Sequence, residues 1–437
     1  MNRLVGKNKT ILVSGPSSVR LLKGEVSVLG AKLSIGDRVI VRRGKTLPFE
    51  ARSSSILEIV NGGGTDIEEV DGSTIPVPWR RAVRELLSSS KPCTVIVLGG
   101  VDCGKTSFCT FMINKALSSA LKPLIIDADL GQSDLGPPAT IGLGVVKRPV
   151  ADLFFIRATA TFFIGNTSPR GVKDALIFGL TKLKERALET NPEIIVINTD
   201  GWVYGDEARE YKVRMIKSIL PDAIVALQYN DELESILSSI EGSRTTCFRL
   251  PPSPSARKRS KEDRKILREQ GYRKLLKSSI LRHLPINWVK LENTPLSLKS
   301  ASNERKLKLS QILGQSVLYC GEGSDTVFVF LKKGEVIDDE RIKRIERVFH
   351  KKLQIMNKGD EKGLLVGLLS DDRDFLGLGV IQGIDYEKGV LKLYTPYRGK
   401  VGIVQFGQVK VDRYGKELGI VAAPMRPITT PHKLNDR

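Results

Sequence analysis

One segment constrains the fold of this chain more than any other. It reads Gly99-Gly100-Val101-Asp102-Cys103-Gly104-Lys105-Thr106, follows the apolar run CTVIVL and opens a stretch of helical character. This is the spacing and context of a phosphate-binding loop, or P-loop. Its glycines let the backbone curl so that successive N–H groups point at phosphate oxygens, and the following helix adds its positive end. We expect residues 99–107, Ser107 included, to bind a nucleoside triphosphate, with Lys105 at the β- and γ-phosphates and Thr106 on Mg²⁺.

The regions around this loop predict the fold class. Between residues 79 and 284, the buried runs CTVIVLGG, PLIIDAD, EIIVINTD and AIVALQY alternate with helical stretches, which is typical of an α/β domain with a mainly parallel sheet. Residues 1–78 contain short β-rich runs separated by glycine and proline, and β-rich runs return in residues 285–437 after one helix near residues 337–350. The prediction is an α/β protein whose central P-loop NTPase-type domain is flanked by β-rich N- and C-terminal domains.

Two carboxylates follow the second buried run of the central domain. Asp127 and Asp129 stand at its C-terminal end, where open α/β sheets bind ligands. Alternation along a strand sends both to the same side. One of them can hold Mg²⁺ through water while the other orients an attacking hydroxyl group. The competing interpretation is that they only cap the next helix.

Polar and aromatic residues end other strands of the same domain. The run EIIVI leads into Asn198-Thr199-Asp200-Gly201-Trp202, and an indole at that point either stacks on a base or sugar or fills the core. The turn from Phe163 to Gly171 contains Arg170 and either contacts substrate or caps a helix.

A proline-rich entry to a basic helix lies near the end of the central domain. Residues 251–265 read PPSPSARKRSKEDRK. A solvated helix face is the default interpretation of such a run. Cations on a short segment after the sheet are also what a lid needs to close over transferring phosphate, so residues 251–275 are a candidate lid.

Composition narrows the class of partner. Lysine and arginine number 69 against 49 acidic residues, a net charge of +20, which favours a polyanionic partner. The N-terminus lacks the apolar core of a signal peptide and no run reaches the ~20 apolar residues needed to cross a bilayer, so we expect no membrane association.

The five cysteines are scattered and odd in number, which fits a reducing intracellular compartment. We therefore expect a cytoplasmic protein, or a nuclear one if the source is eukaryotic. With only three histidines, catalysis should rely on carboxylates, cations and backbone.

Together these residues resemble the polynucleotide 5′-hydroxyl kinase family, which includes the kinase of the eukaryotic pre-mRNA cleavage complex, a pre-rRNA-processing relative and archaeal homologues. Similarity also extends to SGPSSVRLLKGEVSVLGAKL near the start and to GLLVGLLSDDRDFLGLGVIQGIDYEKGVLKLYTPYRG near the end. The archaeal branch fits best. Four elements match in order: the P-loop GGVDCGKT, the carboxylate motif DADLGQ, the Thr199-Asp200-Gly201-Trp202 clasp, and a lid with Arg259 and Arg264.

The resemblance implies an enzyme that transfers the γ-phosphate of ATP or another nucleoside triphosphate, with Mg²⁺, to the 5′-hydroxyl end of RNA or DNA, with RNA-processing proteins as candidate partners. It implies that Asp129 positions or deprotonates the 5′-hydroxyl. Of the two carboxylates at the strand end, this leaves Asp127 to join Thr106 at the metal. Arg259 and Arg264 are then lid cations that act with Lys105 in catalysis. Four residues are expected to contact the acceptor: Gln132, Thr199, Gly201 and Trp202. Asn166 departs from the histidine found in several relatives.

Two other classes of protein compete with a kinase. A GTPase or ATP-driven regulator is suggested by Asn357-Lys358-Gly359-Asp360, which has the N-K-x-D pattern of guanine recognition. The segment lies in the predicted C-terminal domain, so we expect an ordinary turn there. Asp127 and Asp129 also lack the D-x-x-G spacing to Gly131 that a GTPase switch after the P-loop would need. A non-catalytic scaffold that keeps bound ATP is the other class. The intact set of Lys105, Asp129, Trp202 and Arg259 argues against it.

Overall fold

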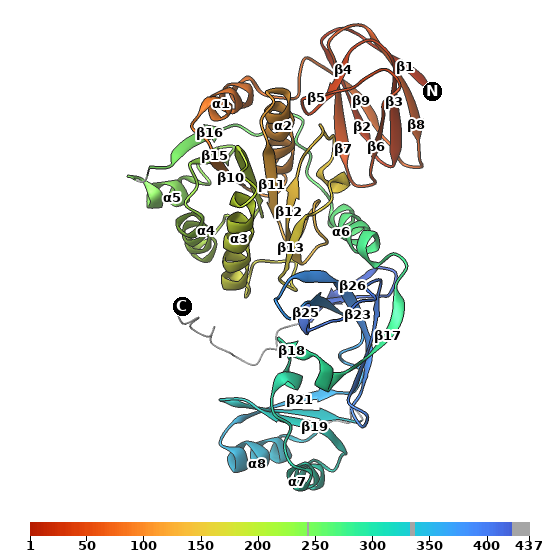
Figure 1. Cartoon of the computed structure of the whole chain (residues 1–437), viewed down its shortest axis with the longest axis vertical. Coiled ribbons are helices and arrows are strands. Elements are labelled where there is room, and N and C mark those ends of the chain that lie inside the picture. The colour runs from red at the N-terminus through yellow and green to blue at the C-terminus, as the bar shows by residue number, and fades with distance from the viewer. Residues whose placement is uncertain (243, 333–336, 422–437) are drawn as a thin grey trace. The chain divides into compact units, whose positions relative to one another are not determined.

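The computed structural model describes residues 1–242, 244–332 and 337–421 (Figure 1). Residues 422–437 of the predicted C-terminal domain lie outside this range. The chain divides into two compact units, Met1–Gly271 and Tyr272–Arg437. No helix within the described residues is long and apolar enough to cross a membrane. The five cysteines are free, and all but Cys247 are buried.

The first unit begins with a β-sandwich. Its two sheets have the strand orders β1-β8-β3-β6 and β5-β4-β7-β2-β9, and all their pairings are antiparallel. Alternating residues of β7 and β8 face the core. The strands are β1 (Asn2–Val5), β2 (Lys9–Ser14), β3 (Ser17–Lys23), β4 (Val26–Val28), β5 (Ala31–Lys32), β6 (Arg38–Val41), β7 (Thr46–Ala51), β8 (Ser55–Asn61) and β9 (Ile67–Asp71).

A seven-stranded sheet forms the P-loop domain, with the order β13-β12-β11-β14-β10-β15-β16. Strands β11, β14, β10, β15 and β16 are mutually parallel, and β12 pairs antiparallel with both β11 and β13, so the predicted mainly parallel sheet is confirmed. The strands are β10 (Cys93–Gly99), β11 (Pro123–Ala128), β12 (Thr140–Val145), β13 (Ala160–Phe163), β14 (Ile194–Thr199), β15 (Ala223–Leu227) and β16 (Thr246–Leu250).

Helices cover both faces of this sheet (Figure 1). Because both faces are buried, β10, β11, β14 and β15 read as continuous apolar runs. Helices α1 and α2 pack on one face, and that core continues into the β-sandwich. Helices α3 to α5 pack on the other. The helices are α1 (Val77–Ser88), α2 (Lys105–Ser118), η1 (Leu153–Phe155), α3 (Lys173–Leu188), α4 (Asp206–Ile219), α5 (Glu234–Leu237), η2 (Ser238–Ile240) and α6 (Lys261–Leu276).

The second unit contains two sheets, with the orders β17-β24-β23-β22-β25-β18, where β26 also pairs with β25, and β19-β20-β21. The predicted helix near residues 337–350 is α8; α7 was not predicted. The N-K-x-D segment is a turn, as expected: the Asn357 N–H donates to Asp360 Oδ2 (2.8 Å) and the Asp360 N–H to the Asn357 carbonyl (3.0 Å). The elements are β17 (Ile280–Pro285), η3 (Ile286–Trp288), β18 (Lys290–Glu292), η4 (Pro295–Ser297), α7 (Asn303–Leu313), β19 (Val317–Glu322), β20 (Thr326–Leu331), α8 (Asp339–Phe349), β21 (Lys352–Asn357), β22 (Leu364–Leu369), β23 (Phe375–Asp385), β24 (Val390–Thr395), β25 (Ile403–Val411) and β26 (Glu417–Ile420).

Candidate nucleotide and acceptor site

The P-loop joins β10 to α2 at the carboxyl edge of the central sheet. Gly104 ends the loop with a φ of +97°, a conformation that side-chain-bearing residues rarely adopt. Lys105 begins α2, and its Nζ donates to the carbonyls of Gly99 (2.9 Å) and Gly100 (2.6 Å). The loop therefore holds its lysine against its own backbone, beside the N–H groups at the start of the helix.

A chain of hydrogen bonds runs from the P-loop threonine to the first strand-end carboxylate. Asn198, near the end of β14, donates from Nδ2 to Thr106 Oγ1 (3.4 Å) and to Asp127 Oδ1 (2.9 Å). Asp127 is fully buried, and its Oδ2 accepts from the Asp134 N–H (2.7 Å). Burial raises the pKa of Asp127 to about 6, with Asp134 and Asp129 adding to the rise. Asn198 had no role in the sequence prediction; its only signal there was its place at a strand end.

These oxygens suit a magnesium ion that is shared with a nucleotide. The oxygens of a hydroxyl group and a carboxylate are hard donors of the kind that Mg²⁺ prefers. No group of three or more His, Cys, Asp or Glu side chains able to hold a metal occurs in the described part of the chain. Protein-bound Mg²⁺ usually keeps several waters and takes substrate phosphate oxygens as ligands, so a small protein ligand set fits. Thr106 is the candidate direct ligand and Asp127 the carboxylate behind it.

Asp129 lies two residues after Asp127 and lines a cavity that the P-loop also lines. Its Oδ1 accepts from the N–H groups of Gly131 (3.1 Å) and Gln132 (3.1 Å). Burial raises the pKa of Asp129, the Lys105 ammonium opposes the rise, and Asp200 adds to it. Gln132 donates to the Gly131 carbonyl (2.9 Å), but its own Oε1 is buried with no hydrogen-bond partner among the described residues. An unpaired buried acceptor in a cavity wall is suited to bind a ligand.

The clasp, residues 199–202, lies directly against the P-loop. The Thr199 hydroxyl is buried and donates to the Val97 carbonyl (2.8 Å) on β10. A Cβ atom on Gly201 would lie 2.8 Å from the backbone N of Val101, so only glycine fits there. Trp202 follows, half-buried, with its indole on the cavity wall. The close approach of the two loops brings the aromatic residue to the triphosphate side of the sheet.

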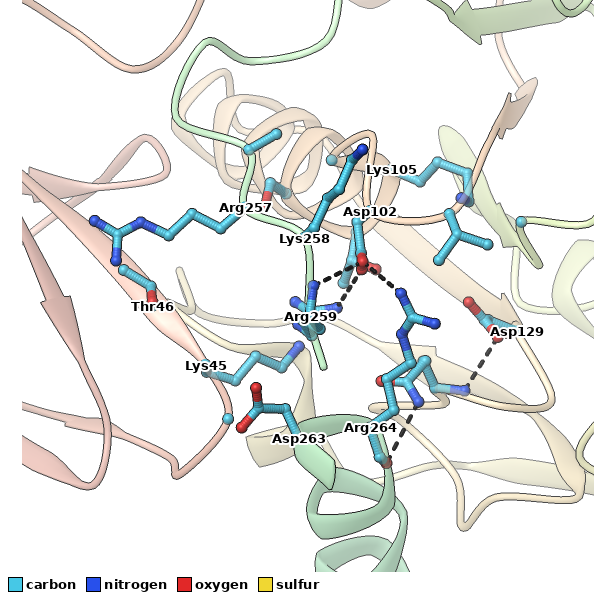
Figure 2. A pocket seen from close by; sticks show the side chains of 18 of the residues that line it. Lys45, Thr46, Asp102, Lys105, Asp129, Arg257, Lys258, Arg259, Asp263 and Arg264 are labelled. Carbon is cyan, nitrogen blue, oxygen red and sulfur yellow. Dashed lines mark hydrogen bonds and ion pairs between the residues drawn. The ribbon is translucent and has the colours of Figure 1, made fainter. Parts of the chain in front are cut away.

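Both lid arginines pair with a carboxylate of the P-loop itself (Figure 2). Arg264 Nη2 lies 2.7 Å from Asp102 Oδ2 and Arg259 Nη1 lies 3.5 Å from Asp102 Oδ1, while the Arg259 N–H also donates to Oδ2 (2.9 Å). The Nε of Arg264 is buried without a partner among the residues the structure describes. Asp102 therefore brings the lid cations to the P-loop, a contact that the sequence did not predict.

The β-sandwich contributes to the site as well. Arg42 is buried and donates to Asp134 (2.5 Å), Asp152 (2.7 Å) and Gln270 on α6 (3.1 Å). Lys45 lies 2.5 Å from the other oxygen of Asp134 and lines the cavity. Burial favours protonation of Asp134, but Lys45 and Arg42 outweigh it and hold the pKa of this carboxyl below its usual range. One network of ion pairs and hydrogen bonds thus joins the β-sandwich to the loop after β11 and to α6.

A single cavity of about 840 Å³ collects most of the predicted site. Predicted residues that do not line it are Gly99, Gly100, Cys103, Asp127 and Thr199, which lie in the walls behind it. Unpredicted lining residues include Lys45 and Thr46 of the β-sandwich and Tyr204 beside the clasp. Arg170, from the turn for which substrate contact and helix capping were the two interpretations, also lines the cavity. Predicted residues that line it are Val101, Asp102, Gly104, Lys105, Thr106, Ser107, Asp129, Gln132, Gly201, Trp202, Arg259 and Arg264.

Comparisons with known proteins agree with this geometry. Residues 99–278 match the family model described as the P-loop of mRNA cleavage and polyadenylation factor CLP1. A polyribonucleotide 5′-hydroxyl-kinase of Methanocaldococcus jannaschii is 31% identical over 354 residues, which cover 79% of this chain and 95% of the relative. The kinase of that name from Pyrococcus furiosus is 29% identical, over 79% and 96% of the two chains. The structure of Clp1p solved with a segment of Pcf11p superposes with a TM-score of 0.65 at 12% identity, over 94% of this chain and 97% of that one, so the two share a fold.

Proposed function

The chain belongs to the family of polyribonucleotide 5′-hydroxyl kinases, and we propose that it transfers the γ-phosphate of ATP to the 5′-hydroxyl end of RNA, in RNA processing or repair. The observation that supports this most is the shared cavity, which joins a P-loop, a strand-end carboxylate, a clasp indole and two lid arginines. A nucleotide hydrolase needs the first of these elements. The clasp indole is what an enzyme with a nucleic-acid acceptor needs in addition.

The nucleotide half of the site consists of residues 99–107. Backbone N–H groups of the loop bind phosphate oxygens, and Lys105 exchanges its carbonyl contacts for the β- and γ-phosphates. Thr106 and Asp127, linked through Asn198, are the residues that would hold Mg²⁺. A bound Mg²⁺ ion would neutralise charge on the phosphate oxygens.

The acceptor half consists of the loop after β11 and the clasp. Asp129 accepts the proton of the 5′-hydroxyl as that oxygen attacks the γ-phosphorus, and the bond to the β-phosphate oxygen breaks. Gln132 offers its unpaired Oε1 to the acceptor. Trp202 stacks on the terminal nucleoside, while Thr199 and Gly201 fix the clasp against β10 and the P-loop.

The lid supplies cations to the transferring group. Arg259 and Arg264 leave Asp102 for the γ-phosphoryl oxygens, where negative charge spreads in the transition state. The two arginines stabilise the transition state more than the bound substrates, so they increase turnover more than ground-state binding.

One assay tests the proposal directly. Purified protein is incubated with γ-labelled ATP and 5′-hydroxyl oligonucleotides of both sugars, with 5′-phosphorylated oligonucleotides as controls. We expect label on RNA that carries a free 5′-hydroxyl and none on the phosphorylated controls. If the protein hydrolyses the nucleotide at the same rate with and without 5′-hydroxyl ends, a regulatory NTPase replaces the kinase as the proposed function.

Replacing Trp202 with alanine should impair the acceptor site alone. Loss of a base–aromatic stack costs about 1–3 kcal/mol, so the KM for the oligonucleotide should rise roughly 5- to 150-fold. The KM for ATP should hardly change. Steady-state kinetics with each substrate varied in turn will measure both constants, and Trp288→Ala, at an exposed tryptophan of the second unit, serves as control. An unchanged oligonucleotide KM would remove the indole from the acceptor site.

Salt should weaken acceptor binding more than nucleotide binding. The chain carries a net charge of +20, and cations around the cavity displace counterions from the backbone phosphates of a polynucleotide. For single strands, each contacted phosphate contributes about 0.7 to the slope of log affinity against log salt concentration. Fluorescence anisotropy with labelled RNA will measure this slope, and we expect it to equal the sum of several such contributions. A flat response between low and moderate salt contradicts an electrostatic groove.

A further inference from the structure

The indole of Trp202 rests on a rigid, buried support. Its ring stacks on the ring of Tyr211 from α4, with centroids 5.8 Å apart and planes inclined by 25°. Tyr211 is fully buried and donates its hydroxyl to Asp200 Oδ2 (2.8 Å). Stacked rings separated by this distance attract one another, and a buried ring leaves its neighbour little freedom. One side of the indole is therefore committed to the protein interior.

Asp200 fixes both the ring below the indole and the backbone that carries it. Its Oδ1 accepts from the Trp202 N–H (2.9 Å), and its Oδ2 also accepts from Lys212 Nζ (2.9 Å). Lys212 is fully buried, so this ion pair is shielded from water. The orientation of Trp202 is set before any acceptor binds.

The cation of Arg170 lies over the ring of the same indole. The Cζ of Arg170 lies 5.2 Å from the centroid of the Trp202 ring, and Arg170 is exposed where Tyr211 is buried. No carboxylate pairs with Arg170 within the described ranges. Lys105 and Lys258 also lack an acidic partner among the described residues, whereas four other cations of the cavity do have one: Lys45 pairs with Asp134, Arg257 with Asp66 and Glu68, and Arg259 and Arg264 with Asp102. Arg170 thus offers an uncompensated charge to whatever enters the cavity.

The turn that carries Arg170 touches the loop of the proposed base. A Cβ atom on Gly131 would lie 3.0 Å from the Thr167 carbonyl oxygen, so the two backbones are in contact. Asp129 hydrogen-bonds the Gly131 N–H from the same loop. Asp129, Trp202 and Arg170 line the same cavity, so a nucleoside whose 5′-hydroxyl faces Asp129 and whose base or sugar reaches Trp202 has Arg170 beside it.

We propose that Arg170 is a specificity-determining residue: when the terminal nucleoside takes its place on Trp202, the Arg170 guanidinium binds the first internucleotide phosphate of the acceptor. The planar guanidinium matches the oxygens of a phosphodiester with paired N–H donors. The acceptor must then be a 5′-hydroxyl nucleoside with a 3′-phosphodiester, rather than a free nucleoside. This inference rests on the proposed function.

The test pairs a change in the protein with a change in the substrate. Wild type and Arg170→Ala are compared on a 5′-hydroxyl hexaribonucleotide that has either a normal phosphodiester or an uncharged methylphosphonate at its first linkage. Charge-assisted contacts of this kind are worth about tenfold in binding, so the neutral linkage should raise the acceptor KM of wild type about tenfold. Arg170→Ala should show the same rise on the normal substrate and little further rise with the neutral linkage, while Arg170→Lys restores part of the loss.

Two controls separate this contact from general electrostatics. A methylphosphonate at the last linkage should affect both proteins equally, and Arg148→Ala removes the same charge from an exposed position outside the cavity. If the first-linkage methylphosphonate weakens Arg170→Ala as much as wild type, or if Arg170→Ala keeps the wild-type acceptor KM, the assignment of Arg170 is wrong and the kinase proposal stands. If wild type transfers phosphate to no 5′-hydroxyl end, both proposals are wrong.

Discussion

Lys105→Ala should lower kcat/KM for phosphoryl transfer about a thousandfold or more, because it removes the cation that stabilises charge on the β- and γ-phosphates. Among the described residues, the Lys105 Nζ hydrogen-bonds only to groups of its own loop: the carbonyls of Gly99 and Gly100 and the thiol of Cys103. The fold should survive the substitution, since the glycine-rich turn and α2 remain. Initial rates of label transfer at saturating and limiting ATP will measure the loss.

The control for Lys105→Ala is Lys115→Ala, which removes the same charge from the last turn of the same helix. Thermal unfolding followed by circular dichroism will show whether both variants are folded. We expect Lys115→Ala to keep its activity. A folded Lys105→Ala protein that transfers phosphate at the wild-type rate would mean that residues 99–107 are not the nucleotide site.

Asp129→Asn should lower turnover about 10²- to 10⁴-fold, the range of a positioned general base, with little change in the affinity for either substrate. Both backbone donors, from Gly131 and Gln132, reach Oδ1, which leaves Oδ2 for the acceptor hydroxyl. An amide at this position keeps the shape of the side chain but cannot accept the proton. Single-turnover rates give the chemical step, and anisotropy with labelled RNA gives acceptor affinity.

The pH profile provides an independent test of the same carboxylate. Asp129 must be ionised to accept a proton, and burial raises its pKa. The loss of activity on acidification should therefore occur at a higher pH than for an ordinary aspartate, and Asp129→Asn should lose this limb of the profile. Asp206→Asn, at an exposed carboxylate in the first turn of α4, is the matched control. A variant at residue 129 that retains both turnover and the acidic limb would exclude Asp129 as the base.

The parts of the site that the sequence predicted are those whose chemistry lies in adjacent residues. Glycine spacing and a following helix identify the P-loop, and strand ends identify Asp129 and Trp202, because parallel strands end at one edge of a sheet. Strand β14 lies between β10 and β11, which brings all three segments together. The same reasoning predicted the parallel strands from their apolar runs.

The parts that escaped prediction depend on contacts between distant residues. Arg42 and Asp134 are 92 positions apart, and Arg264 and Asp102 are 162 apart, so no local pattern links them. Asn198 was visible only as one polar residue at a strand end. Helix α7 was missed because its residues, NERKLKLSQIL, bury only Leu309 and Leu313 and give a weak helical periodicity.

The buried Arg42 network also limits how the domains of this chain can be exchanged. Each nitrogen of the guanidinium donates to the P-loop domain or α6, so a β-sandwich that lacked this arginine would leave Asp134 and Asp152 buried without their cation. Stranding a buried charge costs about 3–5 kcal/mol, a large share of the 5–15 kcal/mol that typically holds a domain folded. A chimera that takes its β-sandwich from one relative and its P-loop domain from another must therefore inherit arginine and aspartates together. For domain exchange, the β-sandwich and the P-loop domain of this chain are therefore a single unit, even though each has a recognisable architecture of its own.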